Sequence, residues 1–412
     1  MPKICFIGNM NNFPFGIAKE FKKMGYDVTQ FIDVPKEYLL DRPESENDNY
    51  YRRYPDWIVD LNFKSTGIIK NIYFLFPNIF FRALLKKISK FDIVFLNGSW
   101  IRLGKYISGS KLVIGLLAGN EVDGADQSLI DDYLSKLSDK SFFIRLIPKA
   151  LYKLIHLRLI KLQQLGIKRL DVINYYLPGV NSKGDKIISE IKNNQNYSRI
   201  ILRGFDTSLF KYCEPDLSKK EFNIVSVTRF TFTNNAHDNK RNDIMLKGIS
   251  DFIKANNIDK GLKIIFFDKG EDVAQAKLLC EDLGLSKYVT WVPQVPLSAL
   301  THYFSECDVA FDQLGNHWVG AGLFSMLSGR PLIANGRPEL YEKYVGEIMP
   351  VCHAINSTEV QEWLTKLYNN RSLIKTLGIS SRNYVLKHYD ISQNMNFYCE
   401  QISKHMSKKS RT

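Results

Sequence analysis

The chain has 412 residues, a length that suits two domains better than a single hydrophobic core. Its net charge of +13 favours anionic partners such as nucleotides or membrane surfaces. The six cysteines form no C-x-x-C pair, which argues against a zinc site and for a reducing compartment. The first residues are typical of a strand rather than of a signal peptide, and no apolar run reaches membrane-spanning length.

The start of the chain predicts a β-α-β unit. Lys3–Ile7 has the pattern of a buried strand, Ile17–Met24 that of a helix opened by Gly16, and Tyr26–Phe31 that of a second strand. We therefore expect a doubly wound α/β domain. A phosphate or an acceptor group could lie at Gly16, although a plain connection fits the same pattern. Residues 33–60 are polar, charged and rich in proline, which predicts an irregular insertion.

Two segments of the first half combine basic charge with apolar side chains. Residues 61–91 contain six basic and no acidic residues, and residues 141–170 contain seven basic and no acidic ones. A basic helix with an apolar flank can lie in an anionic membrane interface, so we expect membrane contact through these segments. The alternative is an ordinary helix with a solvated basic face. Nucleic acid is not expected, since no recognised nucleic-acid-binding motif accompanies the charge.

Polar side chains follow two further predicted strands of the first half. Asn97 comes directly after the apolar stretch Asp92–Leu96, and Asn120 and Glu121 follow Leu112–Leu116. Ligands of open α/β sheets gather at the carboxyl ends of the strands, so these three residues are candidates for an acceptor or catalytic site. Each of them alone is more often a residue that stabilises a loop.

A second β-α series begins at Asn223 and contains a glycine-rich turn. Within it, the strand-like stretch Asp308–Asp312 leads through a polar loop to Gly320-Ala321-Gly322, which opens an apolar run of helical length. Such a turn could bring backbone amides at a helix N-terminus to a phosphate, although a tight connection fits equally. A nicotinamide fingerprint would need a glycine at Ser325, so a dinucleotide is not expected.

Several motifs occur in one order along the second half of the chain. They are Arg203–Phe210, Thr228-Arg229 with Lys240–Ile244, Lys263–Asp272, Leu283–Leu285, Val289–Pro296, Met326–Ala334 and Asn383–Asp390. In this order they resemble the motifs of the GT-B glycosyltransferases, most closely the retaining glycosyltransferase family 4. The resemblance is strong over residues 200 to 390 and weak over the first half.

The resemblance implies a fold of two Rossmann-like domains facing a cleft. We expect an acceptor-binding domain over residues 1–205 and a nucleotide-sugar-binding domain over residues 222–387, with the boundary between about 204 and 221. Residues 388–412 would form a C-terminal helix that crosses back to the first domain. The acceptor implied is a glycan or a lipid-linked glycan of the cell-surface polysaccharide or lipopolysaccharide type. The location implied is cytoplasmic, with peripheral contact at the inner face of the cell membrane.

The resemblance also implies roles for individual residues. Arg229 and Lys240 would meet the diphosphate of the donor, because charge-assisted contacts to phosphate are strong and stabilise the charge that develops on the leaving group. Val295 would lie under the base. The remaining donor-binding candidates are Gly270, Gly320, Ala321 and Gly322. No metal is expected, and a retaining transfer of a hexose needs no conspicuous base, since the leaving-group oxygen assists deprotonation.

The chain departs from the family at two positions. The family's two glutamates, eight positions apart, are replaced by Asn316 and Phe324. Asn316 takes the place of the glutamate near the donor sugar, and Phe324 cannot accept a hydrogen bond from a ribose hydroxyl. Either Ser325 replaces that glutamate, or the donor differs, or the chain is a non-catalytic relative.

An epimerase of similar architecture is the remaining alternative. Such an enzyme would need acid and base side chains in the cleft. Of the seven histidines, the only obvious candidates for this role are His237, His302 and His317, and the sequence gives none of them a clear partner.

Overall fold

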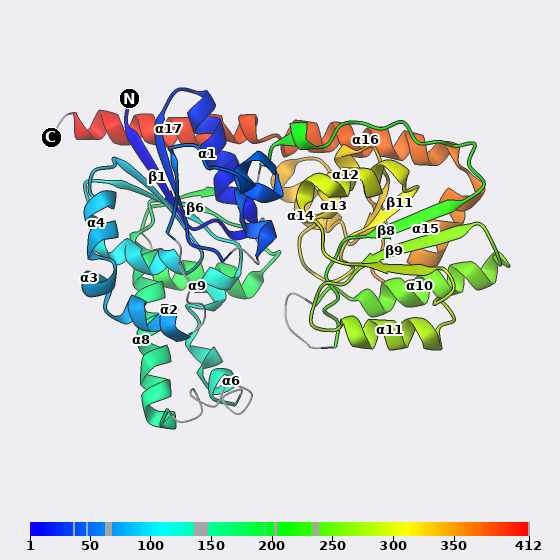
Figure 1. Cartoon of the computed structure of the whole chain (residues 1–412), viewed down its shortest axis with the longest axis horizontal. Coiled ribbons are helices and arrows are strands. Elements are labelled where there is room, and N and C mark those ends of the chain that lie inside the picture. The colour runs from blue at the N-terminus through cyan, green and yellow to red at the C-terminus, as the bar shows by residue number, and fades with distance from the viewer. Residues whose placement is uncertain are drawn as a thin grey trace. The chain divides into compact units, whose positions relative to one another are not determined.

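The structure, a computed structural model, describes residues 1–35, 38–46, 48–61, 68–135, 147–193, 195–201, 204–233 and 239–410. The chain divides into two compact units, each built on one parallel sheet (Figure 1). Unit 1 comprises Met1–Tyr176, Ser182–Phe205 and Ile391–Thr412, and unit 2 comprises Leu177–Asn181 and Asp206–Asp390. The predicted pair of doubly wound α/β domains is therefore confirmed.

The sheet of unit 1 has seven strands in the order β3-β2-β1-β4-β5-β6-β7. They are β1 (Lys3–Ile7), β2 (Asp27–Ile32), β3 (Ile58–Asp60), β4 (Ile93–Asn97), β5 (Leu112–Leu116), β6 (Val172–Asn174) and β7 (Ser198–Ile200). The central strands β4 and β5 are buried along their whole length, as expected for a parallel sheet covered on both faces.

The prediction that residues 33–60 are only an irregular insertion is wrong at the end of that range. Edge strand β3 is too short for a periodic signal, but pairs with β2.

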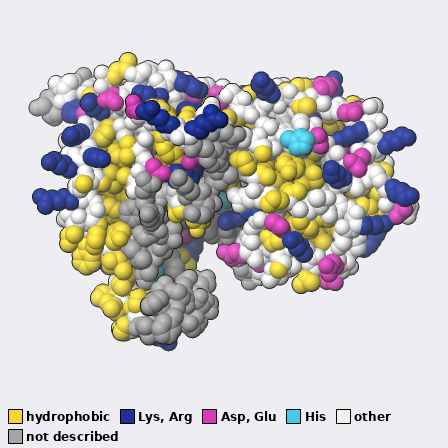
Figure 2. All heavy atoms as spheres, viewed as in Figure 1, with side chains coloured by type: hydrophobic (Ala, Val, Ile, Leu, Met, Phe, Trp, Pro, Cys, Tyr) yellow, Lys and Arg dark blue, Asp and Glu magenta, His cyan; other side chains and the backbone are white. Residues whose placement is uncertain are grey.

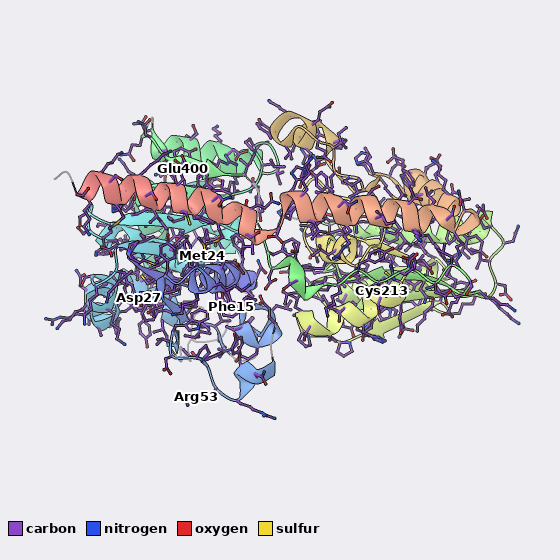
Figure 3. The ribbon with its side chains drawn as sticks, turned by 90° about the horizontal axis from the view of Figure 1, so that it is seen from above. Phe15, Met24, Asp27, Arg53, Cys213 and Glu400 are labelled. Atoms are coloured by element: carbon purple, nitrogen blue, oxygen red, sulfur yellow. The ribbon has the colours of Figure 1, made fainter. Side chains whose placement is uncertain are left out.

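Helices lie on both sides of this sheet (Figure 1). The helices of unit 1 are η1 (Met10–Asn12), α1 (Phe13–Lys23), η2 (Leu39–Asp41), η3 (Pro43–Ser45), η4 (Asp48–Tyr51), α2 (Ile68–Leu75), α3 (Pro77–Phe80), α4 (Arg82–Ile88), η5 (Gly98–Tyr106), α5 (Asn120–Asp123), η6 (Gln127–Leu129), α6 (Ile130–Ser135), α8 (Lys149–Arg169), α9 (Ser182–Lys192) and α17 (Ile391–Lys409). Helix α17 runs beside α1, as Figure 3 shows. It contributes Ile391, Met395, Tyr398 and Ile402 to the core of this unit, as the predicted return of the C-terminal helix requires.

The position of Gly16 corrects the prediction made for it. Helix α1 begins at Phe13, with Pro14 in its first turn, where the missing N–H of proline has no intrahelical partner to lose. Gly16 is therefore a buried residue inside the helix rather than its first residue. A Cβ atom at this position would lie 3.3 Å from Cδ1 of Ile391. The glycine allows α1 to pack closely on α17.

The sheet of unit 2 has six strands in the order β10-β9-β8-β11-β12-β13. They are β8 (Phe222–Ser226), β9 (Leu262–Phe267), β10 (Val289–Val292), β11 (Val309–Phe311), β12 (Leu332–Ala334) and β13 (Cys352–His353). The helices are η8 (Thr207–Leu209), α10 (Asn242–Ala255), α11 (Val273–Asp282), α12 (Leu297–Glu306), α13 (Gly322–Leu327), α14 (Pro338–Val345), α15 (Ser357–Asn369) and α16 (Ser372–His388). Figure 1 shows α12, α13 and α16 on one side of the sheet and α10 and α11 on the other.

A buried arginine fastens the segment that leads into unit 2. Arg330 is fully buried, and its guanidinium donates hydrogen bonds to the carbonyl oxygens of Cys213 at 2.6 Å, Ser305 at 2.6 Å and Cys307 at 2.7 Å. A buried cation is tolerated where its donors are satisfied in this way. The arginine of the Gly329-Arg330-Pro331 motif therefore has a structural role.

Candidate active site

The site candidates of unit 2 lie at the carboxyl edge of its sheet. All six strands are parallel, and the order of the strands reverses between β8 and β11. Such a reversal is the point at which open α/β sheets bind their ligands. The exposed side chain of Arg229 is in the loop after β8, and the exposed Asn316 is in the loop after β11. Lys240, which is half-buried, precedes α10.

Backbone contacts hold Lys240 between these two loops. Its N–H donates to the carbonyl oxygen of Thr231 at 2.7 Å, and its own carbonyl accepts from the N–H of Leu314 at 3.0 Å. The neighbouring Gly315 makes a close approach, because a Cβ atom there would lie 2.0 Å from the carbonyl oxygen of Asn239. The structure thus brings the segments that carry Arg229, Lys240 and Asn316 together at the switch point.

A buried carboxylate shapes the loop that follows Arg229. Asp272 accepts hydrogen bonds from the N–H groups of Phe232 at 2.6 Å and Thr233 at 2.9 Å, and from the Thr233 hydroxyl at 2.7 Å. Burial by itself raises the pKa of Asp272, but the hydrogen bonds from Thr233 and Phe232 lower it, and the net pKa is below the ordinary value. The hydrogen bonds that Asp272 accepts come from residues 40 and 39 positions earlier in the chain.

Gly270, predicted to bind the donor, packs against the same loop. Its φ of +117° is in the region that favours glycine. A Cβ atom there would lie 2.2 Å from the carbonyl oxygen of Phe230, and the N–H of Phe230 donates to the carbonyl of Lys269 at 2.7 Å. In this structure Gly270 lets the loops after β8 and β9 meet.

The glycine-rich turn uses two of its amides within the protein. Asp312, at the end of β11, accepts hydrogen bonds from the N–H groups of Gly320 and Gly322, both at 2.8 Å. The carboxylate therefore occupies the place expected for a phosphate, because an acid suits the positive end of a helix. The prediction that the amides of Gly320 and Gly322 face a donor phosphate is corrected for this conformation. Ala321, between them, is half-exposed.

In this structure the Ser325 hydroxyl is bonded within helix α13. Ser325 is fully buried, and its hydroxyl donates to the carbonyl oxygen of Gly322 at 2.7 Å, a common arrangement for a serine inside a helix. This hydrogen bond argues against the predicted donor contact at Ser325. Phe324 stacks on Phe210 with ring centroids 4.8 Å apart, so it serves packing.

Asn316 is held in place by the loop after β12. Arg337 donates to the backbone carbonyl of Asn316 at 2.9 Å, and Asn335 donates to the carbonyl of Gly315 at 3.0 Å. The side chain of Asn335 also lies 3.4 Å from Oδ1 of Asn316. Asn316 therefore presents an exposed carboxamide on a supported backbone. Val295, in the loop after β10, is half-buried at the same edge of the sheet.

The histidines that could serve epimerase chemistry lie in different surroundings. His302 is exposed on α12, and its Nδ1 lies 3.5 Å from a carboxylate oxygen of Glu306 on the same helix. His317 is buried, and its backbone carbonyl accepts from the side chain of Gln313 at 2.8 Å. His237 is outside the described residues.

In unit 1 the structure brings Asn97 and Glu121 together at the ends of β4 and β5. Glu121 is buried and accepts from the N–H of Gly98 at 2.9 Å, from the N–H of Ala118 at 2.7 Å and from the Asn97 amide at 3.3 Å. Oδ1 of Asn97 accepts from the N–H of Met10 at 2.7 Å. Both side chains hold loops in position. The side chain of Asn120 is outside the described residues.

A pocket of about 280 Å³ opens at the switch point of the unit 1 sheet, beside Asn97. Its polar walls include the buried carboxylate of Asp33, which forms an ion pair with Lys70, and the backbone of Gly98. The Lys70 ammonium also lies 5.6 Å from the ring centroid of Trp100. Sequence reasoning missed Asp33 and Lys70, because they are far apart in the chain and neither belongs to a recognisable motif.

The described residues contain neither a cluster of candidate metal ligands nor a helix suited to cross a membrane. Within them, no group of three or more His, Cys, Asp and Glu side chains is arranged to hold a metal ion. No helix found among them combines the length and apolar character needed to cross a membrane.

No family model and no curated protein sequence matches the chain. Solved structures match it along almost its whole length. The HepE protein of Anabaena, in complex with UDP and glucose, has a TM-score of 0.65 at 12% identity, and the match covers 98% of this chain and 100% of that one. Sucrose-phosphate synthase from Thermosynechococcus elongatus has a TM-score of 0.63 at 13% identity, with the same coverage. A glycosyltransferase from Rickettsia africae has a TM-score of 0.60 at 13% identity, covering 98% of both chains.

The chain has the GT-B fold. The matched proteins are GT-B glycosyltransferases, and the likeness extends over both units. At 12–13% identity this likeness concerns the fold. The predicted GT-B architecture is therefore confirmed.

Proposed function

We propose that this GT-B protein is a glycosyltransferase whose nucleotide-sugar donor binds at the carboxyl edge of the unit 2 sheet. The observation that supports this most directly is the meeting of the Arg229, Lys240 and Asn316 segments at the switch point of that sheet. Two cations on adjoining loops can bind a diphosphate and stabilise the charge that develops on it as the glycosidic bond breaks. Supporting loops fixed by Asp272 and Asp312 keep such groups in place before the donor arrives.

A uridine nucleotide sugar is the first donor to test. HepE, which shares the fold, has been crystallised with UDP and with UDP-glucose. The order of motifs, which resembles that of family 4, supports transfer of a hexose with retention. In such a transfer the acceptor hydroxyl attacks from the side of the leaving diphosphate, and a diphosphate oxygen takes its proton. Arg229 and Lys240 would stabilise that diphosphate, while Val295 would contact the base.

Asn316 is proposed to contact the donor sugar. A carboxamide both donates and accepts hydrogen bonds, so it can bind sugar hydroxyls at a position where the family has a charged glutamate. The ribose has to be bound differently from the family pattern, because Phe324 is stacked on Phe210 and the Ser325 hydroxyl is already bonded. Gly270 and Ala321 lie at the edge where the diphosphate would sit, and no metal is required.

The acceptor is proposed to bind unit 1 by way of the pocket beside Asn97. Carboxylate, ammonium and amide groups in one pocket suit the hydroxyl groups of a sugar, which both donate and accept hydrogen bonds. We propose a glycan or lipid-linked glycan of the cell-surface polysaccharide or lipopolysaccharide type. The protein would then work in the cytoplasm at the inner face of the membrane.

Thermal shift against a panel of nucleotides and nucleotide sugars tests the donor site. Ligand at about 100 times its dissociation constant adds roughly 2.7 kcal/mol of stability. We expect one nucleotide class to stabilise the wild type, and Arg229→Ala and Lys240→Ala each to lose most of that effect. Lys260→Ala removes an exposed lysine of the same unit and should keep the full shift.

The outcomes separate the alternative functions. The absence of a shift across the whole panel would overturn the donor site and favour a non-catalytic relative, for which the replacement of both family glutamates is the supporting observation. If the nucleotide sugar binds, product analysis without acceptor distinguishes the remaining two. Formation of an epimeric nucleotide sugar would identify an epimerase, whereas transfer to an added glycan would identify a glycosyltransferase.

A further inference from the structure

Apolar side chains lie exposed on one face of unit 1, which we call the α3–α8 face. It is formed by Ile72 of α2, Phe76, Ile79 and Phe80 in and before α3, and Leu151 and Leu154 of α8. Ile79 is 71% exposed and Leu154 is 63% exposed. Helices α2 and α8 are in contact, and Figure 2 shows hydrophobic side chains gathered over α3 and the outer part of α8. Contiguous exposed apolar surface on a protein usually marks an interaction site.

The core of unit 1 does not account for these side chains. Phe74 and Phe81 fix α2 and α3 from the inside, with ring centroids 5.3 and 5.0 Å from that of the buried Trp100. On α8, the buried side chain of Tyr152 anchors the first turn of the helix from the inside in the same way. The residues of the α3–α8 face therefore belong to the opposite, outward side of helices that are already anchored. Exposed apolar side chains on the outward side of anchored helices are available to contact a second apolar environment.

The two segments that form this face carry basic charge only, although the neighbouring helix α6 contributes the exposed Asp131. The described residues 68–91 and 147–170 contain no acidic side chain. Exposed basic residues stand on both segments, namely Arg82, Lys86, Lys87, Lys90, Lys149, Lys153, Arg158 and Lys161. Figure 2 shows lysine and arginine side chains beside the apolar area. Lysines and arginines that flank exposed apolar side chains attract anionic lipid headgroups while the apolar groups enter the acyl boundary.

We propose that the α3–α8 face rests on an anionic membrane surface, with Phe76, Ile79, Phe80, Leu151 and Leu154 in the acyl boundary. The flanking cations would contact lipid phosphates. This surface assignment stands independently of the proposed function. We also infer that a lipid of that membrane carries the acceptor, because the membrane would then bring the acceptor to unit 1. This second inference rests on the proposed function.

Vesicle sedimentation of the full chain tests the assignment. Phosphatidylcholine vesicles are compared with vesicles containing about one-third phosphatidylglycerol, at low and at high salt. We expect binding to the anionic vesicles, with loss of binding at high salt. The double variant Ile79→Ser/Leu154→Ser should weaken this binding by roughly tenfold, because both side chains leave the acyl boundary. Lys86→Ser/Lys87→Ser should weaken it and reduce its dependence on salt.

Matched controls lie in unit 2. Leu278→Ser replaces a leucine that is 61% exposed on α11, and Lys254→Ser/Lys260→Ser removes two exposed lysines. Both controls should bind anionic vesicles like the wild type. The test variants change exposed positions and should unfold at the wild-type temperature.

Three results would overturn the assignment. They are no binding to anionic vesicles, equal binding to neutral and anionic vesicles, and wild-type binding by the two test variants. A concentration-dependent dimer that Ile79→Ser/Leu154→Ser abolishes would instead make this face a contact between two copies. Nucleotide-induced thermal shift, measured on the same samples, separates these failures from a failure of the donor site, because it does not involve the α3–α8 face.

Discussion

At the scale of single residues, two buried carboxylates determine the shape of the candidate donor site. Asp272 fixes the loop after Arg229, and Asp312 fixes the turn that opens α13. Asp272 accepts from two backbone N–H groups and Asp312 from three, and a buried donor without a partner costs about 1–3 kcal/mol. These acids are therefore positioning residues for Arg229 and for the glycine-rich turn.

The Asp272 carboxylate should make stability depend on acid pH. Its pKa in the folded protein is lowered by hydrogen bonds, below an unfolded value of about 3.9. Its contribution is therefore complete above about pH 4 and is lost as pH falls through the folded value. We expect Asp272→Asn to lower the free energy of unfolding by about 1–3 kcal/mol at neutral pH. The difference from the wild type should shrink below about pH 4 in urea titrations.

Asp282→Asn provides the comparison, because this aspartate is exposed on α11 of the same unit. The free energy of unfolding of the Asp282→Asn variant should follow that of the wild type across the acid range. A difference between wild type and Asp272→Asn that stayed constant with pH would show that ionisation of Asp272 does not contribute.

At the scale of elements, the loops at the carboxyl edge of unit 2 depend on close backbone contact. Gly315 lets the loop after β11 approach the segment before α10, and Gly270 lets the loops after β8 and β9 meet. The sequence identified Gly270 as a site residue from its motif. It could not assign the reason, because the atoms that exclude a side chain at Gly270 belong to Phe230, in another loop.

Gly315→Ala should disturb the donor site through this contact. The new Cβ atom would lie 2.0 Å from the carbonyl oxygen of Asn239, so the two loops have to separate. We expect a loss of about 1–3 kcal/mol in stability and a strongly reduced nucleotide-induced thermal shift. Gly109→Ala is the matched control, since a Cβ atom there meets nothing within 4 Å, and it should leave both quantities unchanged. Normal nucleotide binding by Gly315→Ala would contradict the role given to this contact.

At the scale of the whole molecule, the C-terminal helix completes the core of unit 1. Ile391, Met395, Tyr398 and Ile402 are buried there, and the Tyr398 hydroxyl accepts a hydrogen bond from Asn174 at 3.1 Å. Full burial of each such side chain contributes about 1.5–3 kcal/mol. Four of them together match the total stability of a typical domain, which is about 5–15 kcal/mol.

Deletion of residues 391–412 should therefore unfold unit 1 while unit 2 persists. We expect proteases to cleave unit 1 rapidly. The nucleotide-induced thermal shift, which we propose to arise in unit 2, should survive. A chain ending at Ser410 retains all of α17 and should behave like the wild type. Protection of unit 1 in the longer deletion would show that its core is complete without α17.

The sequence by itself determined the architecture and pointed to the candidate site. Short apolar stretches separated by helical patterns predict parallel strands, because a strand buried on both faces needs apolar side chains throughout. That is why the predicted limits of β4 and β5 are close to the observed ones. The order of local motifs marked Arg229, Lys240 and Asn316 as candidates, since each belongs to a loop that directly follows or precedes a recognisable element.

Only the tertiary structure decided which polar groups remain available to a ligand. Asp312 takes up the amides of Gly320 and Gly322, the carbonyl of Gly322 takes up the Ser325 hydroxyl, and Gly16 packs against Ile391. Hydrogen bonding and close packing act between atoms that are near in space, and a sequence pattern carries no information about distant partners. The same reason explains the Asp33–Lys70 pair in the unit 1 pocket, which is separated by 37 positions and has no local signal.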